Sequence, residues 1–180
     1  MNNRTGIKNT GNQNINIPRL TVITAVMAAG AAAGSIYTAH YTNTDFFTLS
    51  QLQGTELFRQ LAVFHMIPVF AAFLSSYFGY GAVIALCAAL CRGFAFSAPL
   101  TKNIMANGLG GYFSFTALGS ICGILSVLAV IIMSMQAIEI SSVRRENKLT
   151  EDDQKNTFVL FVCCAAAIIL GAAMDAYMMK

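Results

Sequence analysis

Long stretches without a charged side chain constrain this sequence more than any other feature. No Lys, Arg, Asp or Glu occurs in residues 20–44, 60–91, 103–138 or 156–174. A helix of about 20 apolar residues can cross a hydrocarbon core of about 30 Å. Only 11% of the residues are charged, against about 25% in an ordinary soluble domain. We therefore expect lipid, and not water, to surround most of the folded chain.

The pattern predicts an all-α integral membrane protein, a single bundle of about five transmembrane helices over residues 20–180. The apolar region 60–98 is too long for one span, and we divide it where Ser, Gly and Tyr cluster, at Ser75–Gly81. Pro99 and the segment 102–111 (KNIMANGLGG) form a predicted Gly-rich connection, for which a re-entrant segment is an alternative. The expected spans are 20–42, 60–76, 80–98, 112–138 and 157–176.

The distribution of Lys and Arg predicts the orientation. Residues 1–19 are rich in Asn, carry three cations and are expected to form a flexible cytoplasmic tail. With this tail in the cytoplasm, seven of the eleven Lys and Arg residues lie in the tail or in the loop 141–156, so the C-terminus is expected outside. A cleaved signal peptide is the alternative for the first span, because Ala28–Ala33 offers small residues for cleavage.

Four ionisable residues lie within or beside the spans, where a charge is costly and often functional. His65 is either a neutral histidine hydrogen-bonded within the bundle or a contact for a proton or a partner. Arg92 either extends to the interface or has a structural or partner-facing role. Asp175 either makes a contact or is exposed at the interface, and Glu139 is expected at the solvated inner end of the fourth span.

Pairs of small residues recur at the spacing that lets membrane helices approach closely. Gly30 and Gly34 are four residues apart, and so are Gly93 and Ser97. Gly119 and Gly123 form a third pair. These pairs predict close packing, either within the bundle or between molecules.

No motif for catalysis, phosphate binding or metal binding is present, so we expect no enzyme activity, no cofactor and no metal site. The run Gly108–Gly111 lacks the Lys-Ser/Thr that would follow it in a phosphate-binding loop. The chain has only two His residues, and its five Cys residues lie in apolar runs without a Cys-x-x-Cys pair. The small net charge of +3 and the absence of a basic stripe argue against nucleic acid as a partner.

Four short motifs follow one another along the chain, and in this order they resemble the stage II sporulation protein M family of small multispanning membrane proteins. The likeness covers about residues 20–178. The expected fourth span begins without the Pro-Gln-Asn-like element of many members, and Ser134-Met135-Gln136 is the nearest polar patch. Ser97 stands where a Gly-aromatic step is typical, so the chain resembles a divergent member. The motifs are Ala28-Ala-Gly30-Ala-Ala-Ala-Gly34, Cys91-Arg92-Gly93-Phe94-Ala95-Phe96-Ser97, Asn107-Gly108-Leu109-Gly110-Gly111 and Met174-Asp175-Ala176-Tyr177.

The resemblance implies a non-enzymatic scaffold of the bacterial cell membrane that organises peptidoglycan hydrolases during engulfment of the forespore. The implied partners are two membrane-anchored enzymes, a lytic transglycosylase and an amidase/endopeptidase. Contact with them is expected at the outer loop 43–59, at the joint 99–111 and near Asp175 and Tyr177. A homo-oligomer is left open. The alternative function is a small transporter or a substrate-binding membrane subunit of an uptake system, with His65 and Arg92 near its substrate.

Overall fold

The computed structural model describes residues 17–41, 55–118, 121–145 and 149–178. Each helix contains a segment long and apolar enough to cross a membrane, which in α3 is Gly81–Gly108. The prediction of an all-α membrane bundle of about five spans is therefore confirmed. The five helices are α1 (Ile17–His40), α2 (Thr55–Ser75), α3 (Gly81–Leu118), α4 (Ile121–Arg145) and α5 (Glu151–Met178).

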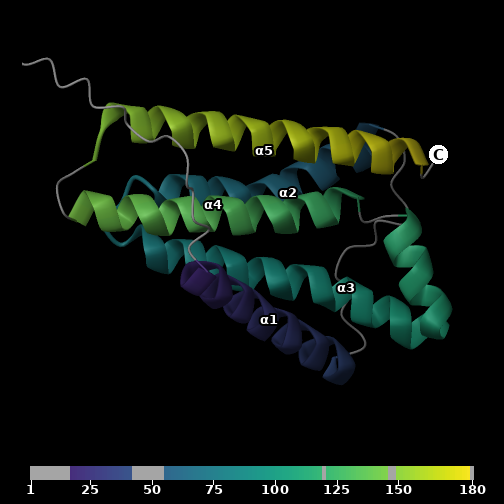
Figure 1. Ribbon diagram of the computed structural model, residues 1–180. Coiled ribbons are helices and arrows are strands. Elements are labelled where there is room, and N and C mark those ends of the chain that lie inside the picture. The colour runs from purple at the N-terminus through teal and green to yellow at the C-terminus, as the bar shows by residue number, and fades with distance from the viewer. Residues whose placement is uncertain (1–16, 42–54, 119–120, 146–148, 179–180) are drawn as a thin grey trace, which may run out of the picture.

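The helix α4 lies at the centre of the bundle and packs against all four other helices. α2 lies beside it, α5 covers one side of this pair, and α3 covers the other side (Figure 1). α1 lies outside α3, which is its main neighbour. Consecutive helices run in opposite directions (Figure 1). We call the end where α4 finishes and α5 starts the Arg144 end, and the end where α4 starts and α5 finishes the Asp175 end.

Glycine lets α1 and α3 touch through their backbones. A Cβ atom added to Gly30 would overlap the carbonyl oxygen of Leu90, and one added to Gly93 would overlap that of Met27. Gly34 meets the hydroxyl of Ser97 in the same way. We call this contact the α1–α3 seam. The close packing predicted for the pairs Gly30/Gly34 and Gly93/Ser97 is confirmed, and it lies within the bundle.

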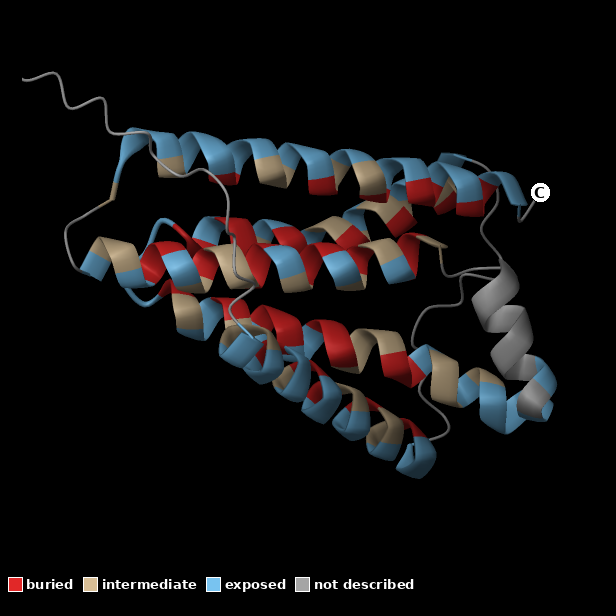
Figure 2. Cartoon of the chain, viewed as in Figure 1, coloured by how far each residue is buried: buried red, intermediate tan, exposed pale blue. Residues whose placement is uncertain are grey.

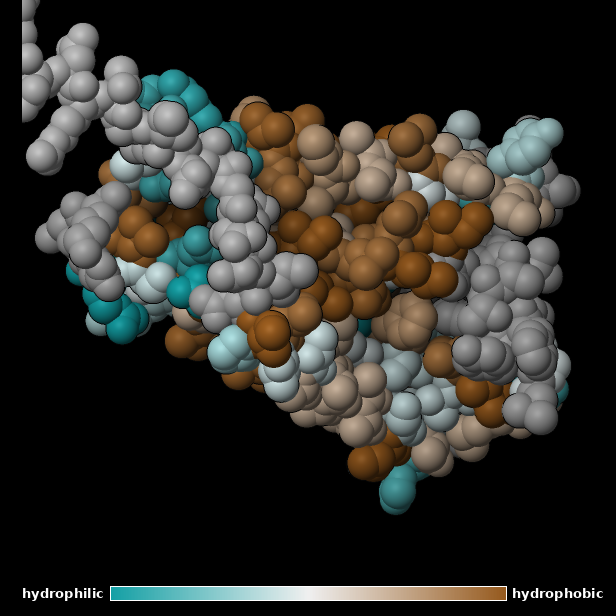
Figure 3. Space-filling model, viewed as in Figure 1, coloured by the Kyte–Doolittle hydropathy of each residue, from teal (hydrophilic) through white to brown (hydrophobic). Residues whose placement is uncertain are grey.

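The buried residues face the centre of the bundle, and large apolar side chains cover its outside. Figure 2 shows the buried residues on the inward sides of the helices, whereas Ile36, Val83 and Leu170 are each more than 60% exposed. The space-filling view shows apolar side chains over the middle of the visible face and polar ones gathered mainly at the Arg144 end (Figure 3). An apolar exterior of this extent suits lipid, where it carries no hydration cost.

The predicted connection at 99–111 is wrong, because α3 continues through Pro99 as far as Gly108. Proline removes one N–H group, and membrane helices tolerate this loss because neighbouring groups compensate for it. The chain turns at Gly108, whose φ of 59° and ψ of −147° are open essentially only to glycine. A short helical segment, 109–118, follows the turn. The fourth span therefore starts at Ile121, and the prediction that it starts at 112 is wrong.

Other helix boundaries differ less from the prediction. α1 begins at Ile17 with Pro18 in its first turn, where the missing N–H would have no helical partner in any case; residues 1–16 of the predicted tail lie outside the described residues. The predicted break at Ser75–Gly81 is confirmed, since α2 ends at Ser75 and α3 begins at Gly81. α4 runs beyond Glu139 to Arg145, so Glu139 does not mark its end.

Candidate functional site

The first turn of α4 is held by a carboxylate from the far end of the chain. The backbone N–H of Cys122 donates a hydrogen bond to Oδ2 of Asp175 on α5, with an N–O distance of 3.0 Å. Asp175 is 1% exposed. The first N–H groups of a helix have no partner within the helix, and the helix dipole favours a negative charge beside them. Asp175 therefore caps α4 from another helix, which accounts for a buried acid in an apolar bundle.

Arg92 contacts the same turn of α4 from the opposite side of the bundle. Its Nη2 donates to the carbonyl oxygen of Gly123 at 3.0 Å, and the side chain is 2% exposed. The sequence left two roles open for Arg92, extension to the membrane interface or a structural or partner-facing role. The structure places its side chain in the interior of the bundle, and not at the interface. No ion pair with a carboxylate is present for Arg92 among the described residues, and its hydrogen bond goes to a neutral carbonyl oxygen.

His65 on α2 lies in the same part of the bundle and is 8% exposed. Its backbone carbonyl accepts a hydrogen bond from the Ser126 hydroxyl at 3.1 Å. Within the described part of the chain, three buried side-chain atoms of this region have no hydrogen-bond partner: Nδ1 of His65, Nε of Arg92 and Oδ1 of Asp175. Buried polar atoms usually have partners, so this group of residues is the strongest candidate for a site.

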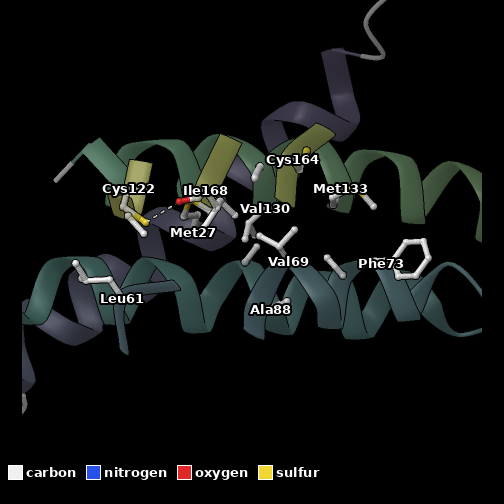
Figure 4. Packing of buried hydrophobic residues seen from close by; sticks show 14 of the residues in the cluster. Met27, Leu61, Val69, Phe73, Ala88, Cys122, Val130, Met133, Cys164 and Ile168 are labelled. Atoms are coloured by element: carbon white, nitrogen blue, oxygen red, sulfur yellow. Dashed lines mark hydrogen bonds between the residues drawn. The ribbon is translucent and has the colours of Figure 1, made fainter. Parts of the chain in front are cut away.

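The buried apolar cluster adjoins this polar region. Figure 4 shows Cys122 and Ile168 beside each other, with the Cys122 thiol 3.5 Å from the Ile168 carbonyl oxygen. Val69, Val130 and Met133 continue the cluster between α2 and α4, and all three are fully buried. The polar groups at the start of α4 therefore adjoin a tightly packed apolar cluster on one side.

A groove runs between α2 and α3 and ends at Arg92. Its volume is about 370 Å³, which is within the range of ligand-binding clefts. Among the described residues that line it, Arg92 is the one charged side chain. Chemically, the groove offers an almost entirely apolar surface, because the Arg92 side chain is 2% exposed. The lining residues are Phe64, Ile67, Pro68, Ala71, Ile84, Cys87, Ala88, Cys91, Arg92 and Ala95.

The glycines that the sequence analysis named as candidate contact or packing residues lie in different surroundings. Gly93 lies in the α1–α3 seam, and Gly123 is buried and accepts the bond from Arg92. Gly108 makes the turn, whereas a Cβ atom on Gly110 would meet no atom within 4 Å. The remaining predicted residues are Gly111, in the segment 109–118, Gly119, outside the described residues, and Tyr177, which is 80% exposed.

Sequence reasoning missed the serines by which α4 holds its neighbours. The hydroxyl of Ser126 bonds to α2, and that of Ser134 donates to the Ala85 carbonyl of α3 at 3.3 Å. Ser141 reaches the Phe78 carbonyl between α2 and α3 at 3.5 Å. These serines are spaced by seven or eight residues, which is two helical turns, so they share one face. Their spacing within an apolar run was the signal that could have identified them.

Among the described residues, no group of three His, Cys, Asp or Glu side chains is arranged to hold a metal ion. No known protein family, curated protein or solved structure matches the chain. The candidate site is therefore defined only by the positions and contacts of its residues.

Proposed function

We propose that this chain is a non-enzymatic membrane scaffold that holds membrane-anchored cell-wall hydrolases, a lytic transglycosylase and an amidase/endopeptidase, during forespore engulfment. The motifs that resemble the stage II sporulation protein M family support the proposal. The ionisable side chains in the bundle also support it, because Arg92 and Asp175 bind the start of α4. This arrangement stabilises a rigid bundle, which is what a scaffold requires.

One observation carries the proposal: the end of α3 extends past the start of α4 at the Asp175 end (Figure 1). Residues 104–108 are all exposed there. Ile104 and Met105 are 36% and 54% exposed. An exposed helix end with apolar side chains, continuous with a rigid spanning helix, is suited to contact the membrane-proximal part of another protein.

We further propose that the Arg144 end faces the cytoplasm of a bacterial cell. Four described cations lie at or near this end, namely Arg19, Arg144, Arg145 and Lys155. Arg59 and Lys102 lie at the opposite end. Cytoplasmic segments of membrane proteins are enriched in Lys and Arg, and this asymmetry supports a cytoplasmic N-terminus and an external C-terminus.

Site-specific photocrosslinking in the host membrane tests the proposed scaffold. A photoreactive phenylalanine analogue replaces Met105 on the projecting end of α3, and a matched control replaces Leu170, which is 66% exposed on α5. We expect Met105 to crosslink to one of the two hydrolases and Leu170 to crosslink mainly to lipid. Recovery of only the subunits of a nucleotide-driven transporter from Met105 would overturn the proposal.

A transporter or a substrate-binding subunit is supported less well by the groove. Such a site needs several polar groups that converge on the substrate. Of the described residues that line the groove, nine are apolar, small or cysteine, and only Arg92 is charged.

A further inference from the structure

The short helical segment 109–118 runs across the bundle, and not along it. Figure 1 shows it crosswise to α4 and α5, between the turn at Gly108 and the start of α4 at Ile121. Both α4 and α5 contain membrane spans, and spanning helices are tilted by only about 20° from the membrane normal on average. A helix crosswise to them therefore lies close to the plane of the membrane. With ten residues it is about 15 Å long, which is too short to cross a hydrocarbon core in any orientation.

The segment 109–118 lies at the level of the membrane surface at the Asp175 end. The span of α3 from Gly81 to Gly108 has 28 residues and rises about 40 Å, and a bilayer with its headgroup regions is about 40–45 Å thick. Tyrosine is enriched at membrane interfaces, and Tyr80, beside the start of α3, is 81% exposed. Figure 1 shows the segment level with the last turns of α5, where Tyr177 is 80% exposed. The end of α3 therefore reaches the headgroup region, and the segment starts there.

The composition of the segment suits lipid better than water. Its sequence, LGGYFSFTAL, contains three aromatic residues and no charge, and a helix of this length is marginal in water without support. Helical spacing places Leu109 and Phe113 on one face, and Phe115 and Leu118 on the opposite face, so neither face is reserved for water. Gly110 is exposed, and a Cβ atom there would meet no atom within 4 Å, so the bundle does not cover the segment at this residue.

We propose that the segment 109–118 is an interfacial helix, which lies in the leaflet at the Asp175 end and packs against the boundary between headgroups and acyl chains. Helices of this kind bury their apolar side chains about 5–10 Å into that boundary. The chain then remains in contact with lipid between the third and fourth spans, and does not form an aqueous loop. The bilayer supports a helix that the bundle leaves open at Gly110. This placement is independent of the proposed scaffold function, because it concerns lipid and not the hydrolases.

The chain has no tryptophan, so a single introduced tryptophan reports its own depth in the bilayer. Leu109→Trp and Thr116→Trp share one face of the segment and lie about 10 Å apart along its axis. Each variant is reconstituted in phosphatidylcholine that carries bromine at one of three depths in its acyl chains. We expect both tryptophans to be quenched at the same depth, about 5–10 Å below the headgroup boundary. The matched control pair on α5, Val162→Trp and Ile169→Trp, has the same spacing and 46% exposure at each position, and should differ in depth by about 10 Å.

A depth difference between Leu109→Trp and Thr116→Trp as large as that of the α5 pair would overturn the proposal, because the segment would then run along the membrane normal. Full quenching by iodide from the water, or no quenching by either bromine or iodide, would also overturn it. The unmodified chain provides a second measurement, since tryptophan itself favours interfaces. A phospholipid with a diazirine beside its headgroup should label residues 109–118, and one with a diazirine at the end of its acyl chain should label the middle of α5 instead. Labelling of the segment by the chain-end probe alone, or by neither probe, would contradict an interfacial position.

Discussion

Two helices pack against α3 in opposite ways. On the side of α1, Gly30 and Gly93 allow the backbones to meet, and no space for a side chain is left between them. On the side of α2, which contains no glycine, a groove of about 370 Å³ remains between the helices. Arg92 and Gly93 are neighbours in sequence, yet Arg92 lines the groove and Gly93 lies in the seam.

The comparison shows that α3 is closed against α1 where glycines lie in the contact, and open against α2, which has no glycine. Lipid gives helices no hydrophobic reason to associate, so contact between backbones and small polar bonds must hold them together. The seam has both, because Thr101 on α3 donates to Ser35 on α1 at 3.0 Å. A larger side chain should therefore destabilise the bundle on the α1 side of α3, and should leave its stability nearly unchanged on the α2 side.

The strongest test of the seam is Gly30→Leu. The new side chain would overlap the Leu90 backbone, and we expect a loss of at least about 3 kcal/mol in the free energy of unfolding. Unfolding in mixed micelles with increasing SDS measures it. The control Ala33→Leu introduces the same side chain at an exposed position of α1 and should change stability by less than about 0.5 kcal/mol. Equal stability of the two variants would show that the seam is not closed.

A smaller change on the opposite wall of the seam is Gly93→Ala. Its Cβ atom would overlap the Met27 carbonyl oxygen, so we expect a loss of about 2 kcal/mol in the same measurement. Gly79→Ala is the matched control, because a Cβ atom there meets no atom within 4 Å. If Gly93→Ala is as stable as this control, the backbones are farther apart than described.

Thr101→Val tests the polar bond of the seam and keeps the shape of the side chain. We expect a loss of about 0.6 kcal/mol, the average for hydrogen bonds between membrane helices. A double-mutant cycle with Ser35→Ala should recover the same coupling energy. Thr24→Val serves as the control, since the Thr24 hydroxyl bonds only to the backbone of its own helix. A coupling energy of zero would exclude a contribution from this bond.

The groove should tolerate what the seam does not. Ala71→Leu adds bulk to the groove wall, and we expect the free energy of unfolding to change by less than about 0.5 kcal/mol. A loss as large as that of Gly30→Leu would mean that α2 and α3 leave no usable space, and the contrast between the two sides of α3 would disappear.

The sequence was sufficient for features whose signal is local. Charges mark the ends of apolar runs, and Ser, Gly and Tyr mark the turn at Ser75–Gly81, so the number of spans and this turn were predicted correctly. The seam was also foreseeable, because Gly30/Gly34 and Gly93/Ser97 have the spacing of a helix contact. These patterns do not depend on knowing which helices are neighbours.

The start of α4 and the candidate site depend on residues that are distant in the sequence. Residues 103–138 contain no charge, so hydropathy gives no reason to end one helix at Gly108 and begin another at Ile121. The position of α4 is instead fixed by bonds to Arg92 and Asp175, 31 and 53 residues away from their partners. Composition also gave no indication of the groove, because its shape comes from the way in which α2 and α3 pack.

The cap that Asp175 provides for α4 sets an order of assembly. The ribosome synthesises α4 before the end of α5. The Cys122 N–H group therefore lacks its acceptor, Asp175 Oδ2, until α5 is complete. In a nascent chain arrested before Asp175, we expect faster hydrogen exchange at Cys122 than in the complete bundle. We therefore expect the first turn of α4 to reach its full stability only after α5 has been inserted as far as Asp175.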